Sequence, residues 1–383
     1  MTSARGGQSI SHTGAGKGDP APTASGEVAR PLPTGPELRA RNVTMRDIAE
    51  KLGVSIKTVS NVVNDRPNVG PRTRDRVQQA IRELNYRPQV GAQQMRTGTS
   101  GLITLAIPSL AGTYFSELAQ AFADEAQRRR RSIMLHSTAA GREEELSVLS
   151  GFTRVLGDGV VFNPLLIGED VLARLGRTIQ PTVFIGEHLE ESDLPAGSDY
   201  VRTDNQRAAH EATSHLLGLG CRRPAYLGAL ELSEAQQEHS TSRLRLRGYH
   251  QALEEAGGIA PAIQSVFGWN QESGRAGVQA LMCHAPEVDG IVCGNDDLAR
   301  GALQGLQELG TLVPDQVSVI GHDNTLESPL TRPPLTTIDP DKSTLAVTVL
   351  ELLTERIDGY DGPPRVVDTP HRLVERASTV ARV

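Results

Sequence analysis

The sequence has 383 residues, of which 38% are hydrophobic and 22% charged, with a formal net charge of −7. This length predicts two or three globular domains, and the lack of an apolar run of membrane-spanning length excludes an integral membrane protein. The three cysteines, at positions 221, 283 and 293, show no disulfide or metal-ligand spacing, which favours a reducing compartment and hence the cytoplasm.

Residues 1–41 are rich in Gly, Ser, Thr, Ala and Pro and contain almost no large apolar side chains. This composition predicts a disordered tail. The tail has no apolar stretch of the kind found in secretory signal peptides, so we do not expect export. The run GAGKGD at residues 14–19 has the glycines and lysine of a phosphate loop, but no strand precedes it.

Residues 42–88 predict a compact helical domain. Thr44 and Asp47 form a capping pair, with an oxygen acceptor at the start of a helix and an acid one turn later. Apolar residues then recur at helical spacing until Gly53, which tolerates the positive φ of a tight turn. A second helix follows from Ser55 and a third comes after it, so the prediction is three short helices around a small apolar core.

Two helices that cross over a short glycine turn leave the outer face of the second helix free for recognition. The side chains on that face are mostly short or polar and can reach base edges and phosphates of DNA. They are Ser55, Ile56, Lys57, Thr58, Ser60 and Asn61. An ordinary helical hairpin is the alternative, but residues 42–99 hold 10 Lys and Arg against 5 Asp and Glu in an acidic chain. This local excess of positive charge favours a polyanionic partner.

The runs VTMRDIAEKLGVSIKTVSNVVN and TRDRVQQAIRELNYRP, followed by AQQM, resemble the headpiece of the LacI/GalR family of bacterial transcription regulators. The resemblance is dense over these segments and continues more weakly towards the C-terminus. It implies a helix-turn-helix DNA-binding domain over residues 42–88 and adds Thr44 and Asn64 to the expected DNA contacts. For residues 1–41 an inert tail is favoured over one that adds a further DNA contact.

Residues 89–99 follow Pro88, and proline disfavours helix in the residue before it. In the family this segment is a hinge that orders on operator DNA, where an apolar side chain opens the minor groove, and Met95 stands at that position. A polar linker is the alternative interpretation. Gly91 costs a helix about 1 kcal/mol relative to alanine, and Val90 stands where many relatives have a basic residue.

From residue 100 short apolar runs alternate with amphipathic helices, and among these runs are GLITLAIP, RSIMLHS, DGVVFNP and TVFIGE. This alternation predicts parallel sheets with right-handed crossovers, and its restart at RPAYLGA predicts two α/β lobes with a cleft between them. The resemblance implies a periplasmic-binding-protein-like core over residues 100–383, in which the chain crosses between lobes three times. We expect lobe 1 over residues 101–220 and 339–364, and lobe 2 over residues 221–338 and 365–383.

Polar and aromatic side chains follow several predicted strands, at the carboxyl ends where parallel sheets bind small ligands. By carry-over from the family, Tyr114, Phe115 and Trp269 would present ring faces to a ligand. The polar groups expected to bind its hydroxyls or ring heteroatoms are Arg245, Asn295, Asp296 and Asp323. Each has a plainer alternative: the aspartates as helix caps, the arginine as a surface charge and the rings as core. Asp204 is equally consistent with an inter-lobe contact and with a cap.

The sequence contains no Gly-x-Ser-x-Gly nucleophile elbow and no phosphate loop ending in Gly-Lys-Ser/Thr. Its ten histidines form no metal-ligand pair on one helix. We therefore expect no catalysis, no cofactor and no metal ion. A small-molecule binding protein that does not bind DNA is the rival interpretation of the core, and the attached head argues against it.

The resemblance implies a homodimer that binds double-stranded DNA at a near-palindromic operator. An effector would change operator affinity through its differential affinity for two arrangements of the lobes. We expect a repressor that responds to a carbohydrate, and a corepressed regulator that responds to a nucleobase or nucleoside is the alternative. No leucine heptad stands at the C-terminal end of the sequence, which favours a dimer over a tetramer.

Overall fold

The structure is a computed structural model, and the chain divides after Pro88 into two compact units, here called the head and the core. The predicted tail, the hinge segment with Met95, and Asn64 lie outside the residues that the structure describes. Those described residues are 43–63, 65–86, 99–151, 157–167, 169–187, 189, 191–230 and 240–382.

The head consists of three helices, α1 (Met45–Leu52), α2 (Ile56–Val63) and α3 (Pro71–Glu83). Helix α1 begins with a capping box, in which the Thr44 hydroxyl accepts from the Asp47 amide at 3.3 Å and the Asp47 carboxylate accepts from the Thr44 amide at 2.7 Å. Gly53 ends α1 with φ of 65°, as the turn requires. The apolar stripes of the helices meet in one small core, centred on Ile48, Val59 and Val77.

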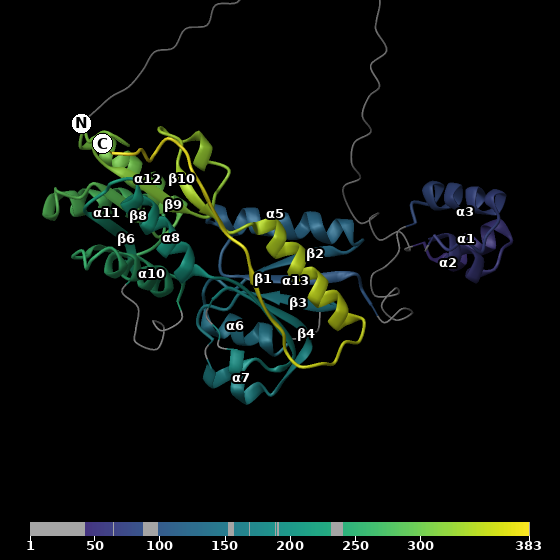
Figure 1. The fold of residues 1–383 in the computed structure, drawn as a ribbon. Helices are drawn as coiled ribbons and strands as arrows, with labels where there is room; N and C mark the ends of the chain where they lie inside the picture. The colour runs from purple at the N-terminus through teal and green to yellow at the C-terminus, as the bar shows by residue number, and fades with distance from the viewer. Residues whose placement is uncertain are drawn as a thin grey trace, which may run out of the picture. The chain divides into compact units, whose positions relative to one another are not determined.

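Lobe 1 of the core is a six-stranded parallel sheet with helices on both faces (Figure 1). Its strand order is β11-β5-β4-β3-β1-β2. The strands are β1 (Leu102–Ile107), β2 (Ser132–Ser137), β3 (Gly159–Phe162), β4 (Arg177–Ile185), β5 (Ala196–Thr203) and β11 (Val366–Thr369). Helices α5 (Thr113–Arg128) and α13 (Lys342–Ile357) share a hydrophobic core with one face of the sheet. Helices α6 (Arg142–Leu149) and α7 (Glu169–Leu175) cover the other face.

Lobe 2 repeats this plan with strand order β12-β10-β9-β8-β6-β7. Its strands are β6 (Pro224–Leu230), β7 (Ala262–Val266), β8 (Gly290–Cys293), β9 (Ser318–His322), β10 (Thr336–Asp339) and β12 (Arg372–Val374). One face is covered by α8 (Asn205–Gly218) and α10 (Thr241–Glu255), the other by α11 (Gln271–His284) and α12 (Asp296–Glu308). Among the described strands, the expectation of parallel pairing fails only at β12, an edge strand that pairs antiparallel to β10.

The lobe boundaries differ from those expected. Helix α8 belongs to lobe 2, because Ala208, Ala212 and Leu216 are buried against lobe-2 aromatic side chains. Lobe 1 therefore ends near Asp204 and not at residue 220. Its second segment runs past residue 364, because β11 pairs in parallel with β5 and adds a strand to the lobe-1 sheet. The chain thus passes between lobes after β5, after β10 and after β11, which are three crossings.

Candidate DNA-binding face and effector cleft

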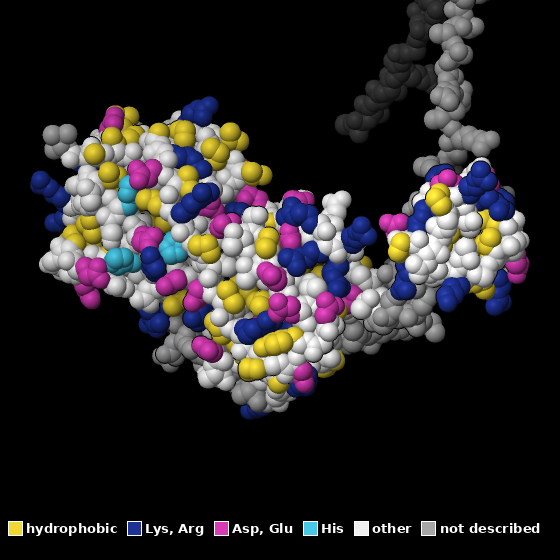
Figure 2. All heavy atoms as spheres, turned by 45° about the vertical axis from the view of Figure 1, so that its right-hand side comes forward, with side chains coloured by type: hydrophobic (Ala, Val, Ile, Leu, Met, Phe, Trp, Pro, Cys, Tyr) yellow, Lys and Arg dark blue, Asp and Glu magenta, His cyan; other side chains and the backbone are white. Residues whose placement is uncertain are grey.

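The face of α2 that the sequence marks for DNA recognition is accessible in the head. Val59 and Val62 are buried in the head. Ser55, Ile56 and Lys57 at the start of the helix are exposed, and Ile56 is 45% exposed. An exposed apolar side chain at the start of a recognition helix can contact the methyl group of thymine. Figure 2 shows Lys and Arg side chains prominent on the surface of the head.

Two of the hydroxyls expected to contact DNA also cap helices of the head. The Ser55 hydroxyl accepts from the Thr58 amide at 3.0 Å and lies 2.8 Å from the Thr58 hydroxyl, so it caps α2. The Thr44 hydroxyl donates to the Asp47 carboxylate at 2.8 Å, which completes the capping of α1. Thr44 is exposed, and its hydroxyl can reach a phosphate only by leaving this cap or by accepting a bridging water.

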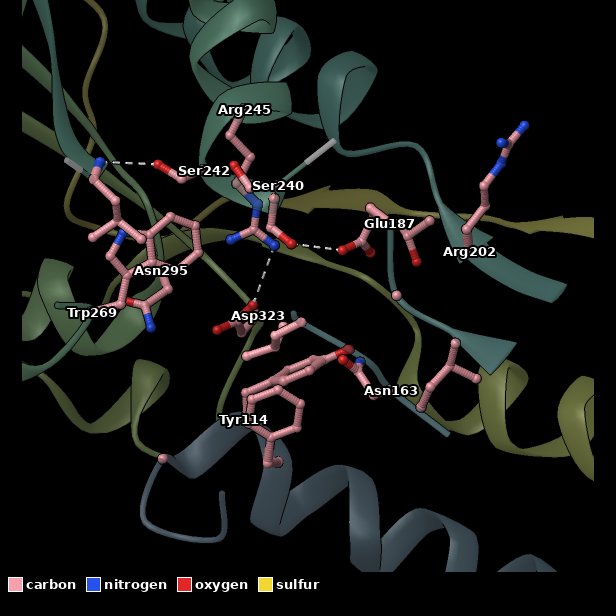
Figure 3. A pocket seen from close by; sticks show the side chains of 18 of the residues that line it. Tyr114, Asn163, Glu187, Arg202, Ser240, Ser242, Arg245, Trp269, Asn295 and Asp323 are labelled. Atoms are coloured by element: carbon pink, nitrogen blue, oxygen red, sulfur yellow. Dashed lines mark hydrogen bonds and ion pairs between the residues drawn. The ribbon is translucent and has the colours of Figure 1, made fainter. Parts of the chain in front are cut away.

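A cavity of about 360 Å³ lies between the two lobes, at the carboxyl ends of their strands. Figure 3 shows side chains from both lobes converging on it. From lobe 1 come Tyr114, Phe115, Asn163, Glu187 and Arg202, and from lobe 2 come Arg245, Trp269, Asn295, Asp297 and Asp323.

Arg245 lies at the centre of the lobe-2 wall, and its side chain is 8% exposed. Its Nε donates to the side-chain oxygen Oδ1 of Asn205 at 2.6 Å, and its Nη1 donates to the backbone carbonyl of Gly294. The guanidinium carbon lies 5.2 Å from the centroid of the Trp269 ring. These contacts fix the guanidinium and point Nη2 at Asp323, whose Oδ1 lies 3.8 Å away.

Trp269 forms a flat wall of the same lobe. Its indole Nε1 donates to the Gly228 carbonyl at 2.8 Å, which sets the orientation of the ring. The ring lies against Gly294, where an added Cβ would stand 2.9 Å from indole carbons. A side chain at position 294 would therefore displace the indole, so the wall requires glycine.

The Asp323 carboxyl group faces the cavity, although the residue is only 5% exposed. It has no hydrogen-bond partner among the described residues, and the ion pair with Arg245 is long. Burial raises the pKa of Asp323 to about 8, and the positive charge of Arg245 opposes this shift. The site thus holds a carboxyl group that a ligand can engage by hydrogen bonds.

The structure separates Asp296 from the other expected ligand contacts. Asp296 is fully buried and does not line the cavity. Its carboxylate accepts from the hydroxyls of Ser328 at 2.5 Å and Thr337 at 2.6 Å, and from the Thr325 amide at 2.9 Å. Asp296 therefore stabilises the interior of lobe 2 by hydrogen bonds. Its neighbour Asp297 lines the cavity instead. Asp204 caps the start of α8, because its carboxylate accepts from the Arg207 amide at 2.9 Å.

Besides Arg202, two cavity side chains of lobe 1 were absent from the sequence predictions. Glu187 follows β4, and its carboxylate accepts from the Thr241 hydroxyl of lobe 2 at 2.7 Å. Burial raises the pKa of Glu187, and the bond from Thr241 opposes the shift. Asn163 follows β3, and its side-chain oxygen is buried without a partner among the described residues. Applying the strand-end rule to TVFIGE and VVFNP would have identified both.

Further hydrogen bonds join the lobes beside the cavity. The Thr113 hydroxyl of α5 donates to the Asp297 carboxylate at 3.4 Å. The Leu326 amide of lobe 2 donates to the Glu117 carboxylate of α5 at 2.7 Å. Any change in the angle between the lobes must break or remake these bonds.

Comparison with known proteins assigns both units. Residues 44–89 match the family of bacterial regulatory proteins, lacI family, and residues 213–379 match a periplasmic-binding-protein-like domain. A solved structure from Sanguibacter keddieii, assigned to the LacI family of transcriptional regulators, is 33% identical and matches with a TM-score of 0.64. The match covers 73% of this chain and 98% of that one. The chain belongs to the LacI family.

Two further members of the LacI family extend over the head as well as the core. Catabolite control protein A of Priestia megaterium is 29% identical over 340 residues, which cover 88% of this chain and 99% of that one. The lac repressor dimer, bound to operator and the anti-inducer ONPF, is 28% identical with a TM-score of 0.72. That match covers 89% of this chain and 100% of the repressor chain.

The family membership makes this chain a DNA-binding transcription regulator with a two-lobed ligand-binding core. The relatives are transcription regulators and not enzymes. In the part of the chain that the structure describes, no group of three or more His, Cys, Asp or Glu is placed to hold a metal ion. None of the described helices combines the length and apolarity needed to cross a membrane.

Proposed function

We propose that this LacI-family regulator is a repressor of a near-palindromic operator and that a small carbohydrate, bound between the lobes, changes its operator affinity. The observation that carries the proposal is the inter-lobe cavity, in which polar side chains from both lobes face a ligand beside an aromatic wall. Asp323 and Asn163 supply such side chains from opposite lobes, and Trp269 supplies the wall.

A sugar suits these groups because its hydroxyls donate in several directions, whereas its C–H face packs on a ring. The cavity volume lies near the lower end of ordinary small-molecule pockets, roughly 300–1,000 Å³, which favours a small ligand. A nucleobase is the second candidate, because the flat indole of Trp269 could stack on a planar ring. The number of acceptor groups favours the sugar, since a base carries few donors and all lie in one plane.

The coupling to DNA follows from which lobe holds which group. A ligand that contacts Asp323 and Asn163 together stabilises one angle between the lobes, and it shifts their equilibrium by its differential affinity. Lobe 1 begins directly after the segment that leads from the head. In a homodimer the two heads would have to match two half-sites, so a change in lobe angle changes operator affinity. We place this action in the cytoplasm.

The proposal can be tested in two stages. DNA selected from random duplexes by the purified protein defines an operator, and a thermal-shift screen against sugars and nucleosides identifies an effector, because a bound ligand raises apparent stability. The effector is then titrated into the protein–operator complex. A sugar that raises the melting temperature and changes operator affinity supports the proposal. A nucleobase that does both supports the alternative, and failure to prefer any duplex refutes the function itself.

A further inference from the structure

Four consecutive arginines stand at the end of α5 and in the turn to β2. These residues, Arg128, Arg129, Arg130 and Arg131, are called the arginine cluster below. The chain as a whole has a net charge of −7, so a run of four cations is a marked local exception. Neither the inter-lobe cavity nor the recognition face of the head uses it.

A buried carboxylate orients two of these side chains. Glu125 is 6% exposed, and it accepts from Nε of Arg128 at 2.6 Å and from Nε of Arg129 at 2.6 Å. Both contacts engage the inner nitrogen of the guanidinium. The outer nitrogens, Nη1 and Nη2, make no hydrogen bond to any described residue. Arg130 is exposed and has no ion pair within the described part of the chain.

A second buried carboxylate ties the cluster to the first residues of the core. Asp158 accepts from Nη1 of Arg131 at 3.1 Å, from the Ser100 amide at 2.5 Å and from the Gly101 amide at 2.8 Å. The arginine cluster therefore lies at the point where the chain enters the core from the segment that follows the head. Figure 1 shows the C-terminal end of α5 beside this point of entry.

The tether to the head is short. Ser100 follows Tyr86, the last described residue of the head, by 14 residues. A segment of that length spans about 20 Å as a helix and at most about 50 Å when fully extended. A tether of this length allows a duplex held by the head to reach the arginine cluster.

We propose that the arginine cluster binds phosphates of the DNA backbone beside the operator and so adds a contact from the core that does not depend on sequence. The inference rests on the proposed function, since it assumes that the head holds DNA. Guanidinium groups with free outer nitrogens match phosphate oxygens in geometry and charge. The cluster would supply affinity and the head would supply specificity.

The surroundings favour DNA over an acidic protein as the partner. The exposed neighbours of the cluster are Asp124, Gln127 and Ser132, all polar. Protein interfaces are usually built around an apolar or aromatic centre, and none of these three residues supplies one. A purely structural role is the other competitor, because cations at the end of a helix offset its dipole.

The test replaces the two exposed arginines in the full-length protein, as Arg128→Gln with Arg130→Gln. The matched control is Arg222→Gln with Arg223→Gln, which removes two exposed arginines from lobe 2. Affinity is measured against a duplex that extends beyond the operator and against a scrambled duplex of equal length. The salt concentration is varied from about 50 to about 300 mM, because each lost phosphate contact lowers the slope of log Kd against log salt by about 0.9.

We expect the variant slope to be shallower by about 1 to 2, with binding weaker by about tenfold near 0.1 M salt. Both duplexes should lose affinity equally, and the control should bind as the wild-type protein does. Unchanged slope and affinity in the variant, with the wild type still binding its operator, would overturn the inference alone. A lower melting temperature with an unchanged slope would assign the cluster a structural role, and binding to polyglutamate but not to DNA would assign it to a protein. If the wild type binds no duplex, the proposed function fails first.

Discussion

The two walls of the effector cavity are built differently. On lobe 2, Arg245 and Trp269 are each held by hydrogen bonds within their own lobe. On lobe 1, Asn163 has a buried oxygen without a partner among the described residues, and the Glu187 carboxylate accepts a hydrogen bond from Thr241 of lobe 2. A preassembled wall loses little entropy when a ligand arrives, so lobe 2 should supply most of the affinity. Lobe 1 completes its contacts only when the lobes approach, so it should supply most of the response.

The largest effect is expected from Arg245→Ala on lobe 2. Truncating one member of a buried, hydrogen-bonded charged group costs about 2–5 kcal/mol, so effector affinity should fall about 30-fold or more. The measurement is calorimetric titration of the effector, with Arg247→Ala as the control on the exposed side of the same helix. Operator binding without effector should persist. A folded variant that keeps the wild-type effector affinity would remove Arg245 from the site.

The second prediction tests whether the hydrogen bonds of Asp296 stabilise the interior of lobe 2. Asp296→Ala leaves the hydroxyls of Ser328 and Thr337 without their acceptor, and such losses cost about 1–3 kcal/mol per buried group. The free energy of unfolding should fall by about 2–4 kcal/mol. Urea denaturation measures it, and Asp297→Ala, which changes the neighbouring carboxylate at the cavity, should cost less. Equal losses in the two variants would contradict the assignment of Asp296 to the interior.

The third prediction concerns the response and not the affinity. Thr241→Val keeps the shape of the side chain but removes the hydroxyl that donates to Glu187 across the cavity. One hydrogen bond contributes about 0.5–1.5 kcal/mol, so the effector-induced change in operator affinity should shift by about threefold to tenfold. Thr241→Ser restores the donor and should restore the response. Should the valine variant respond as the wild type does, the bond has no part in coupling the lobes.

The last prediction concerns the pH dependence of stability. The pKa of Asp323 is raised to about 8 by burial, from an ordinary value near 4 in the unfolded chain. The folded protein therefore keeps a proton that the unfolded chain releases, and the stability associated with this group is lost as the pH rises from about 4 to about 8. Asp323→Asn cannot ionise, so the variant should gain stability relative to the wild type across that window. A stability difference between the two proteins that stays constant with pH would show that folding does not raise the pKa of Asp323.

Local sequence signals predicted the head well. The capping pair at Thr44 and Asp47, the turn at Gly53 and the inward spacing of Val59 and Val62 depend on neighbours within one or two turns. Such features are fixed by the local chain, and the structure has all of them. The accessible face of α2 is what the buried stripe leaves exposed, and its role in DNA recognition stays a prediction.

Assignments that depend on distant partners were less predictable. The apolar stripe of α8 predicts a buried helix face but does not identify the sheet that buries it, so the expected lobe boundary was wrong. Asp296 and Asp297 are adjacent in sequence, yet consecutive side chains on a helix point about 100° apart. Which of the two reaches the cavity depends on how α12 is set against β9 and β10. No local pattern contains that information.

The contact between Trp269 and Gly294 has a consequence for anyone who wishes to convert this regulator into a biosensor for another compound. The backbone at position 294 is already at van der Waals distance from the indole, so mutagenesis there would disturb the wall without enlarging the cavity. Shortening the side chain at position 269 would instead create a new recess floored by bare peptide groups, which can hydrogen-bond to a bulkier analogue. Libraries for altered ligand choice should therefore vary the tryptophan and leave the glycine in place.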